Sequence, residues 1–153
     1  FNVPGLKCAQ ILTGDEATKE ALAGVPMAHN DSWGSLGVVA AVAAYTEGDA
    51  WLAALVERLD QQRTLLRDLL AEHLPEARMR PLEATYLAWL DLRAYGHPDP
   101  AEVILRGGVR VSPGRSYWPG LDGHVRLNIA TSPERLTEIV RRMAAALSSS
   151  RPA

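Results

Sequence analysis

The spacing of apolar residues along the chain predicts several helices. From about Ala50 to His73, leucines recur at steps of three to seven residues and charged residues fall mostly between them. This pattern is typical of an amphipathic helix of about six or seven turns, with Asp49 placed to cap its start. Leu36–Tyr45 is continuously apolar, which predicts a buried helix. Shorter helices are expected at residues 15–24, from Pro100 to about Leu105, and from Ser132 and Pro133 to about Leu147.

Short runs rich in apolar and aromatic residues predict strands between these helices. Thr85–Leu92 has the density of a buried strand. The other expected strands are Cys8–Leu12, Ala77–Pro81, Val109–Ser112 and His124–Ala130, and residues 113–123 are expected to form a long loop. Helices come first, and strands and helices then alternate. This order predicts a two-layer α/β domain with helices on one face of a small sheet.

Composition narrows the class of protein. The 153 residues are 47% hydrophobic and 22% charged, the balance of a globular domain. The net charge of −2 argues against nucleic acid as the main partner. No apolar run approaches the ~20 residues that cross a bilayer, so no membrane partner is expected. Cys8 is the single cysteine, which fits a reducing cytoplasm, and a packed thiol is favoured over a nucleophile.

Arg126 is the strongest candidate for chemistry in the residues themselves. It lies in a strand that is otherwise apolar at alternate positions, where an arginine is costly to bury without a partner. The side chain either faces water at an edge of the sheet or forms a fork that binds a carboxylate through two parallel hydrogen bonds. Spacing alone leaves both interpretations open. The four histidines do not pair at metal-ligand spacing, so no dedicated zinc site is expected.

Four stretches stand in the order and spacing of a known family: Phe1–Lys7, Thr85–Asp91, Gly108–Gly114 and Val125–Asn128. Together they resemble the C-terminal part of fold-type I pyridoxal-phosphate (PLP) enzymes, most closely the aminotransferase-like cystathionine β-lyases (C–S lyases). Each motif is weak alone, whereas four in register over nearly the whole chain are specific. The resemblance implies the C-terminal portion of a PLP-dependent transferase fold. Residues 1–48 would end the large PLP-binding domain, and residues 49–153 would form a small α/β domain with a long amphipathic helix.

The resemblance also implies roles for individual residues. Arg126 would pair with the α-carboxylate of an amino-acid substrate. Lys7 would stand where many relatives place an arginine on the PLP phosphate, although a solvated loop lysine is the alternative. Tyr86 and Tyr117, the second in the loop from Ser112 to Tyr117, would line the substrate side of the pocket, with ordinary packing as their alternative.

The Schiff-base lysine of the family is not expected within this chain. It would lie two residues before Phe1, and neither Lys7 nor Lys19 follows its pattern. No catalytic residue is therefore expected here, and the chain alone is expected to be inactive. In the chain alone, the apolar run Leu36–Tyr45 is expected to be exposed and to favour self-association, unless a remainder of the protein covers it. The complete enzyme is expected to be a cytoplasmic homodimer, with His29–Trp33 near the partner subunit. Transamination and β-elimination of a sulfur group both remain open.

Two alternatives come from other classes of protein. An aminotransferase-like domain in some transcription regulators senses an amino acid without catalysis, and it would use the same arginine. An α/β interaction module would leave Arg126 merely exposed.

Overall fold

The computed structural model describes residues 1–25 and 34–149. The chain divides into two compact units, Phe1–Leu55 and Val56–Ala153. The division falls inside the long helix α3 (Asp49–His73), a few residues beyond the boundary expected at residue 48. The assignment of the two parts to a large and a small domain stays a prediction. The segment His29–Trp33, expected near a partner subunit, lies outside the described residues.

The first unit is helical in its described part. A short 3₁₀ helix, η1 (Pro4–Leu6), precedes α1 (Glu16–Ala23) and α2 (Ser35–Glu47), and the first turns of α3 complete the unit. Asp15 caps α1 as expected, because the backbone N–H of Thr18 donates to its carboxylate at 2.7 Å. Phe1 stacks on Trp51 with ring centroids 5.7 Å apart.

One helix of this unit is exposed, and one expected strand is absent. Leu36–Tyr45 is helical as predicted, but only Gly37 of α2 is buried, and Leu36 is 76% exposed, in line with the apolar surface expected for the chain alone. Cys8–Leu12 forms no strand, and Leu12 is 95% exposed. An apolar run favours a helix or a strand locally, but burial requires another element to cover it. Within the described residues of this unit no sheet or helix layer does so.

The second unit contains the four-stranded sheet. Its strands are β1 (Arg78–Met79), β2 (Leu87–Asp91), β3 (Ser112–Pro113) and β4 (His124–Asn128), in the spatial order β1-β2-β4-β3. All three pairings are antiparallel. The strand expected at Val109–Ser112 is displaced toward the C-terminus, because only Ser112 and Pro113 pair with β4.

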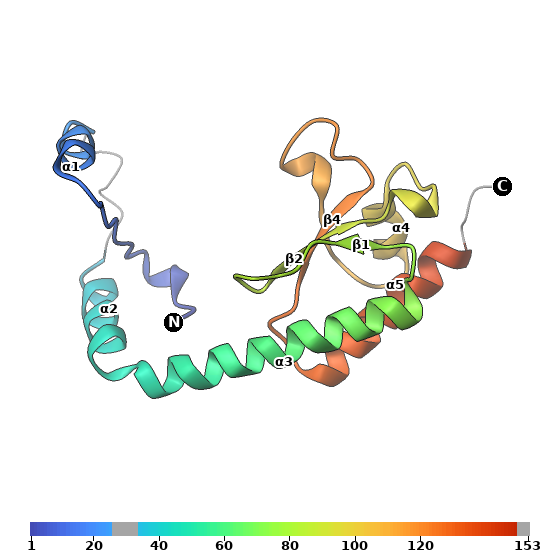
Figure 1. Ribbon diagram of the computed structural model, residues 1–153, viewed down its shortest axis with the longest axis horizontal. Coiled ribbons are helices and arrows are strands. Elements are labelled where there is room, and N and C mark those ends of the chain that lie inside the picture. Colours follow the sequence, from blue (N-terminus) through green and yellow to red (C-terminus); the bar gives the residue numbers. More distant parts are fainter. Residues whose placement is uncertain (26–33, 150–153) are drawn as a thin grey trace. The chain divides into compact units, whose positions relative to one another are not determined.

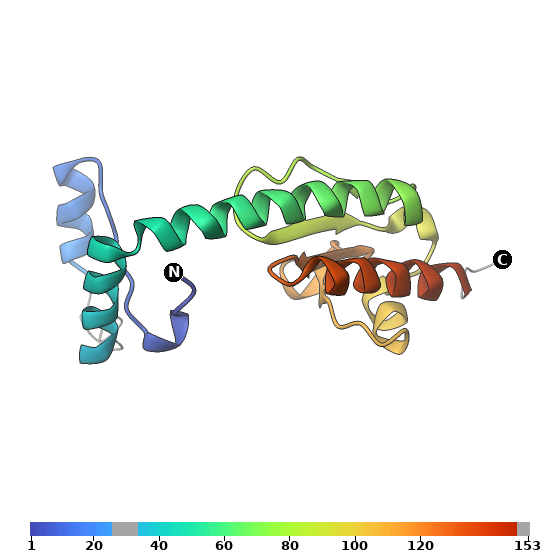
Figure 2. The same cartoon turned by 90° about the horizontal axis from the view of Figure 1, so that it is seen from below.

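Helices cover one face of this sheet. Figures 1 and 2 show α3 and α5 (Pro133–Ser149) running along the same side of the strands. They form one core with α4 (Pro100–Arg106) and the inward residues of the two central strands; its members include Leu66, Leu70, Ala88, Leu90, Ile104, Val125, Leu127, Leu136 and Val140. Each fully buried aliphatic side chain of this size contributes about 1.5–3 kcal/mol. The predicted two-layer α/β architecture is confirmed.

One buried polar side chain ties the long helix to the sheet. Gln62 of α3 is 1% exposed. Its amide nitrogen donates to the backbone oxygen of Ile129 at 3.3 Å and to that of Thr131 at 2.7 Å. These carbonyls directly follow β4, so the contact fixes the end of the strand that carries Arg126 against α3.

No single helix in the described ranges is both long and apolar enough to cross a bilayer, although the bent pair α2 and α3 meets that criterion when taken together.

Candidate functional site

The site lies on the second face of the sheet, which carries the alternate residues of β2 and β4. Inward residues of these strands are buried, whereas Trp89, Asp91, His124 and Arg126 are half-buried. Because side chains alternate along a strand, these four lie on the face opposite the helices. We call this surface the open face.

Strand register arranges the open face in two rows. In the first row Arg78 lies opposite Asp91, and Asp91 lies opposite His124. In the second row Trp89 lies opposite Arg126, and Arg126 lies opposite Ser112. Directly opposed residues have Cβ atoms about 4.5–5.5 Å apart, so members of a row can touch.

Arg126 is held by two neighbours, neither of them acidic. Its Nη2 donates to the hydroxyl of Ser112 at 3.4 Å, a long hydrogen bond. The Tyr117 ring lies under the guanidinium, with the Cζ atom 5.1 Å from the ring centroid, which is within the range of a cation–π contact. Within the part of the chain that the structure describes, no carboxylate pairs with Arg126. The half-buried guanidinium therefore has hydrogen-bonding capacity left for an external acceptor.

Tyr117 is positioned by the turn before it and by Trp89. It follows the 3₁₀ helix η4 (Gly114–Ser116), and its ring meets Trp89 edge-on with centroids 5.4 Å apart. Gly114 packs so closely that an added Cβ would lie 2.9 Å from the His124 Cβ, so a larger residue would displace this turn. The Trp89 ring in turn stacks on His124 at 6.0 Å.

Asp91 is ion-paired and permanently charged near neutral pH. The Arg93 guanidinium donates to both of its oxygens, from Nε at 2.9 Å and from Nη2 at 2.7 Å. Hydrogen bonding from Arg93 lowers the pKa of Asp91 to about 2. His124 Nε2 lies 3.9 Å from the same carboxylate. Asp91 therefore cannot serve as a proton donor at neutral pH, and its charge is largely neutralised within the chain.

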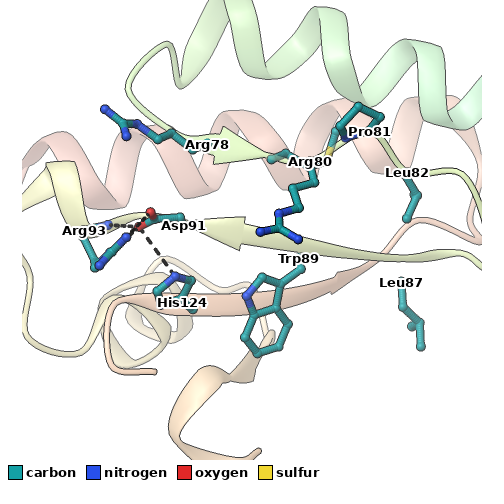
Figure 3. Close-up of a pocket in the computed structure, with 10 residues that line it drawn as sticks. Arg78, Arg80, Pro81, Leu82, Leu87, Trp89, Asp91, Arg93 and His124 are labelled. Atoms are coloured by element: carbon teal, nitrogen blue, oxygen red, sulfur yellow. Dashed lines mark hydrogen bonds and ion pairs between the residues drawn. The ribbon is translucent and has the colours of Figure 1, made fainter. Parts of the chain in front are cut away.

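A pocket of about 630 Å³ opens beside Trp89 on the β1 side of the open face. Figure 3 shows its lining, which includes Arg78, Arg80, Arg93, Asp91 and His124. Arg80 extends from the end of β1 toward β2 next to Trp89, whereas Arg78 points away from it (Figure 3). Three arginines against one aspartate leave this pocket cationic.

The structure brings together some of the predicted site residues and not others. Arg126 and Tyr117 are in contact, and Ser112 of the predicted loop joins them. Tyr86 precedes β2 and packs against the hydrophobic core, so its place in a substrate pocket stays a prediction. Lys7 lies in the first unit, where it is exposed and ends η1 with a φ of 49°, so its contact with a cofactor stays a prediction too.

Sequence reasoning missed Trp89 as the residue paired with Arg126, and it missed Asp91, His124 and Arg80 as residues of the adjoining pocket. The strands were correctly located, and alternation within them already separates inward from outward residues. The missing information is the register between strands, which depends on pairing between residues 11 to 41 positions apart in the chain and is not visible in either segment.

Comparison with known proteins identifies the family. The sequence model described as aminotransferase class I and II matches residues 1–143. The chain belongs to this family. A relative from Mycobacterium tuberculosis, which carries cystathionine beta-lyase in its name, is 39% identical over 166 residues, covering 96% of this chain and 40% of the relative. Cystathionine beta-lyase PatB of Bacillus subtilis is 34% identical, covering 97% of this chain and 39% of PatB.

A solved structure of a related enzyme also resembles this aminotransferase-family chain. The PLP-bound C–S lyase from Staphylococcus hominis superposes with a TM-score of 0.82 at 31% identity, covering 97% of this chain and 40% of that one. The expected resemblance to the C–S lyase subgroup and the expected cofactor of the family, PLP, are confirmed. The chain spans about 40% of the length of these relatives.

The lysines present do not fit the covalent attachment of PLP. Lys19 is exposed and forms an ion pair with Glu16 at 2.9 Å, and Lys7 is exposed in a loop. A Schiff-base lysine is instead held beside the cofactor in a site shielded from water, where its pKa is lowered. This aminotransferase-family chain thus contains a candidate arginine for binding a substrate carboxylate. Neither of its two lysines fits the position that binds the cofactor covalently.

Proposed function

We propose that this chain provides the arginine that binds the substrate carboxylate in a PLP-dependent cystathionine β-lyase or aminotransferase, an enzyme that acts on an amino acid. The observation that carries the proposal is Arg126 on the open face, braced by Tyr117 and Ser112, with no acidic partner among the described residues. The names of the relatives favour the lyase reaction.

The surroundings of Arg126 suit a carboxylate. The planar guanidinium offers parallel N–H donors that match the two oxygens of a carboxylate. The aromatic rings of Tyr117 and Trp89 exclude part of the solvent around it, which strengthens the attraction to an anion. The cation–π contact restrains the guanidinium before ligand arrives, so less side-chain entropy is lost on binding.

The contribution of this chain is binding and orientation. A carboxylate fixed at Arg126 would restrict rotation of the amino acid and so present the bond to be broken in one direction, which is an orientation effect. We propose that Lys7 contacts the cofactor phosphate and that the chain alone is inactive. A cytoplasmic homodimer remains the expectation for the complete protein.

The test is made in the complete, PLP-loaded enzyme with the variant Arg126→Gln. Loss of a charge-assisted, partly desolvated contact should lower kcat/KM for the amino-acid substrate by roughly 10- to 150-fold. Arg126→Lys should recover only part of this loss, because an ammonium lacks the fork. Arg106→Gln, an exposed arginine at the end of α4, is the matched control and should change little.

Unchanged kinetics and substrate affinity in Arg126→Gln would refute the assigned role and favour an arginine that is merely exposed. A complete protein that binds the amino acid through Arg126 without turning it over would instead favour a non-catalytic amino-acid sensor.

A further inference from the structure

We propose that the ion pair between Arg115 and Asp99 positions Tyr117 beneath Arg126 and so sets the affinity of the site for a carboxylate. This inference deepens the proposed function and rests on it, since the substrate carboxylate is taken to bind at Arg126. It adds two positioning residues, which act through the Tyr117 ring rather than by touching the ligand.

The segment that carries Tyr117 lies at the surface. Residues 115–120 are all exposed, and Tyr117 itself is 44% exposed. The hydrophobic core therefore does little to fix the direction of this ring. The backbone N–H of Tyr117 donates to the Gly114 oxygen at 2.9 Å, which shapes the turn but does not fasten it to the rest of the domain.

Gly114 and Arg115 fasten the turn at its start. Gly114 is buried, and an added Cβ would collide with the backbone oxygen of Leu121. Arg115 follows directly, and its Nη1 donates to Oδ2 of Asp99, 16 positions earlier in the chain. This ion pair ties the turn to the start of α4. Tyr117 follows two residues later, so the tie acts close to the ring.

Asp99 is a fixed anchor for Arg115. Its Oδ1 caps α4 by accepting a hydrogen bond from the backbone N–H of Glu102 at 3.2 Å, and α4 packs into the core through Val103 and Ile104. Burial raises the pKa of Asp99, but hydrogen bonds from Arg115 and from the Glu102 backbone outweigh that effect and hold the pKa below its ordinary value. The carboxylate is therefore charged at neutral pH, with one oxygen on the helix and the other on Arg115.

Loss of this tie would give the Tyr117 ring more directions to adopt. The centroid of this ring now lies 5.1 Å from the Arg126 Cζ atom and 5.4 Å from the centroid of the Trp89 ring. A cation–π contact requires the guanidinium to lie over the face of the ring. With a more mobile ring, more side-chain entropy would be lost when a carboxylate binds, and binding would weaken.

The experiment uses the complete, PLP-loaded enzyme and propionate, which presents a carboxylate without an amino group. Dissociation constants are measured by titration calorimetry. Arg115→Gln and Asp99→Asn should each weaken propionate binding roughly two- to threefold, within the range of a partly exposed ion pair. Asparagine caps a helix as well as aspartate does, so Asp99→Asn removes the charge and keeps the cap. Arg106→Gln, the exposed arginine at the end of α4, should leave the affinity unchanged.

The two substitutions separate positioning from charge. If Arg115 and Asp99 acted only by their charges through space, removal of the negative charge in Asp99→Asn would strengthen propionate binding, whereas loss of the ion pair weakens it in both variants. A second test repeats both substitutions in a Tyr117→Ala background. Neither should weaken binding further there, because the ring through which they act is gone.

The outcomes separate this inference from the proposed function. Unchanged affinity in both variants, stronger binding in Asp99→Asn, or the same loss with and without the Tyr117 ring overturns the positioning role. If Arg126→Gln nevertheless weakens propionate binding, the proposed function stands without it. If Arg126→Gln leaves the propionate affinity unchanged, the proposed function itself fails.

Discussion

Replacing Gln62 by leucine keeps the approximate volume of a buried side chain but removes a donor that serves two carbonyls. The Ile129 oxygen lies in a buried environment and the Thr131 oxygen in a partly buried one. The Ile129 oxygen keeps the backbone N–H of Thr131 as a donor at 2.8 Å, whereas the partly buried Thr131 oxygen loses its 2.7 Å bond. The two lost bonds together cost about 2 kcal/mol. Leucine offsets roughly 1 kcal/mol through its apolar burial. We therefore expect the free energy of unfolding to fall by about 1 kcal/mol.

Urea denaturation followed by circular dichroism measures this loss, which corresponds to a midpoint lower by roughly 0.5 M. The neighbouring Gln61→Leu is the matched control, because Gln61 is exposed and its only described side-chain contact is a 3.4 Å hydrogen bond from Arg58. It should change stability by no more than about 0.5 kcal/mol. Equal stability of the two variants would show that the Gln62 bonds to the end of β4 carry no net free energy.

Two further predictions concern the open face. Asp91→Asn should lower the free energy of unfolding at pH 7 by about 1–2 kcal/mol, a figure reduced for the exposure of Arg93. Folding lowers the pKa of Asp91 from 3.8 to about 2. The ionised carboxylate therefore contributes its full stabilisation of the folded state above pH 3.8, and this contribution is lost as the pH falls through 2. Urea titrations between pH 7 and pH 2.5 should therefore show the two proteins converging, and a difference that does not depend on pH would contradict the ion pair. Tyr117→Ala should weaken carboxylate binding at Arg126 roughly two- to fivefold through loss of the cation–π contact, while Tyr117→Phe keeps the ring and most of the affinity. Equal affinities of the Ala and Phe variants in calorimetry would rule out that contact.

Helix α3 and strands β2 and β4 were predictable because their signals are local. The leucine spacing of α3 sets the face that packs, and the aromatic and apolar density of Thr85–Leu92 marks a strand wherever it finds a partner. The exposure of Leu36–Tyr45 and the absence of a strand at Cys8–Leu12 have one physical cause. Both segments are apolar enough to be buried, but burial is a property of the neighbours and not of the segment.

For the site, the sequence by itself determined that an arginine stands in an apolar strand and that its surroundings resemble those of a family that grips a carboxylate. Only the tertiary structure decided what surrounds it. Pairing of β2, β3 and β4 places Trp89 and Ser112 on either side of Arg126, and the turn at Gly114 brings Tyr117 under the guanidinium. These residues are up to 37 positions away from Arg126 in the chain. Register between strands is fixed by the packing of the whole core, so a local sequence pattern can name the arginine but cannot name its neighbours.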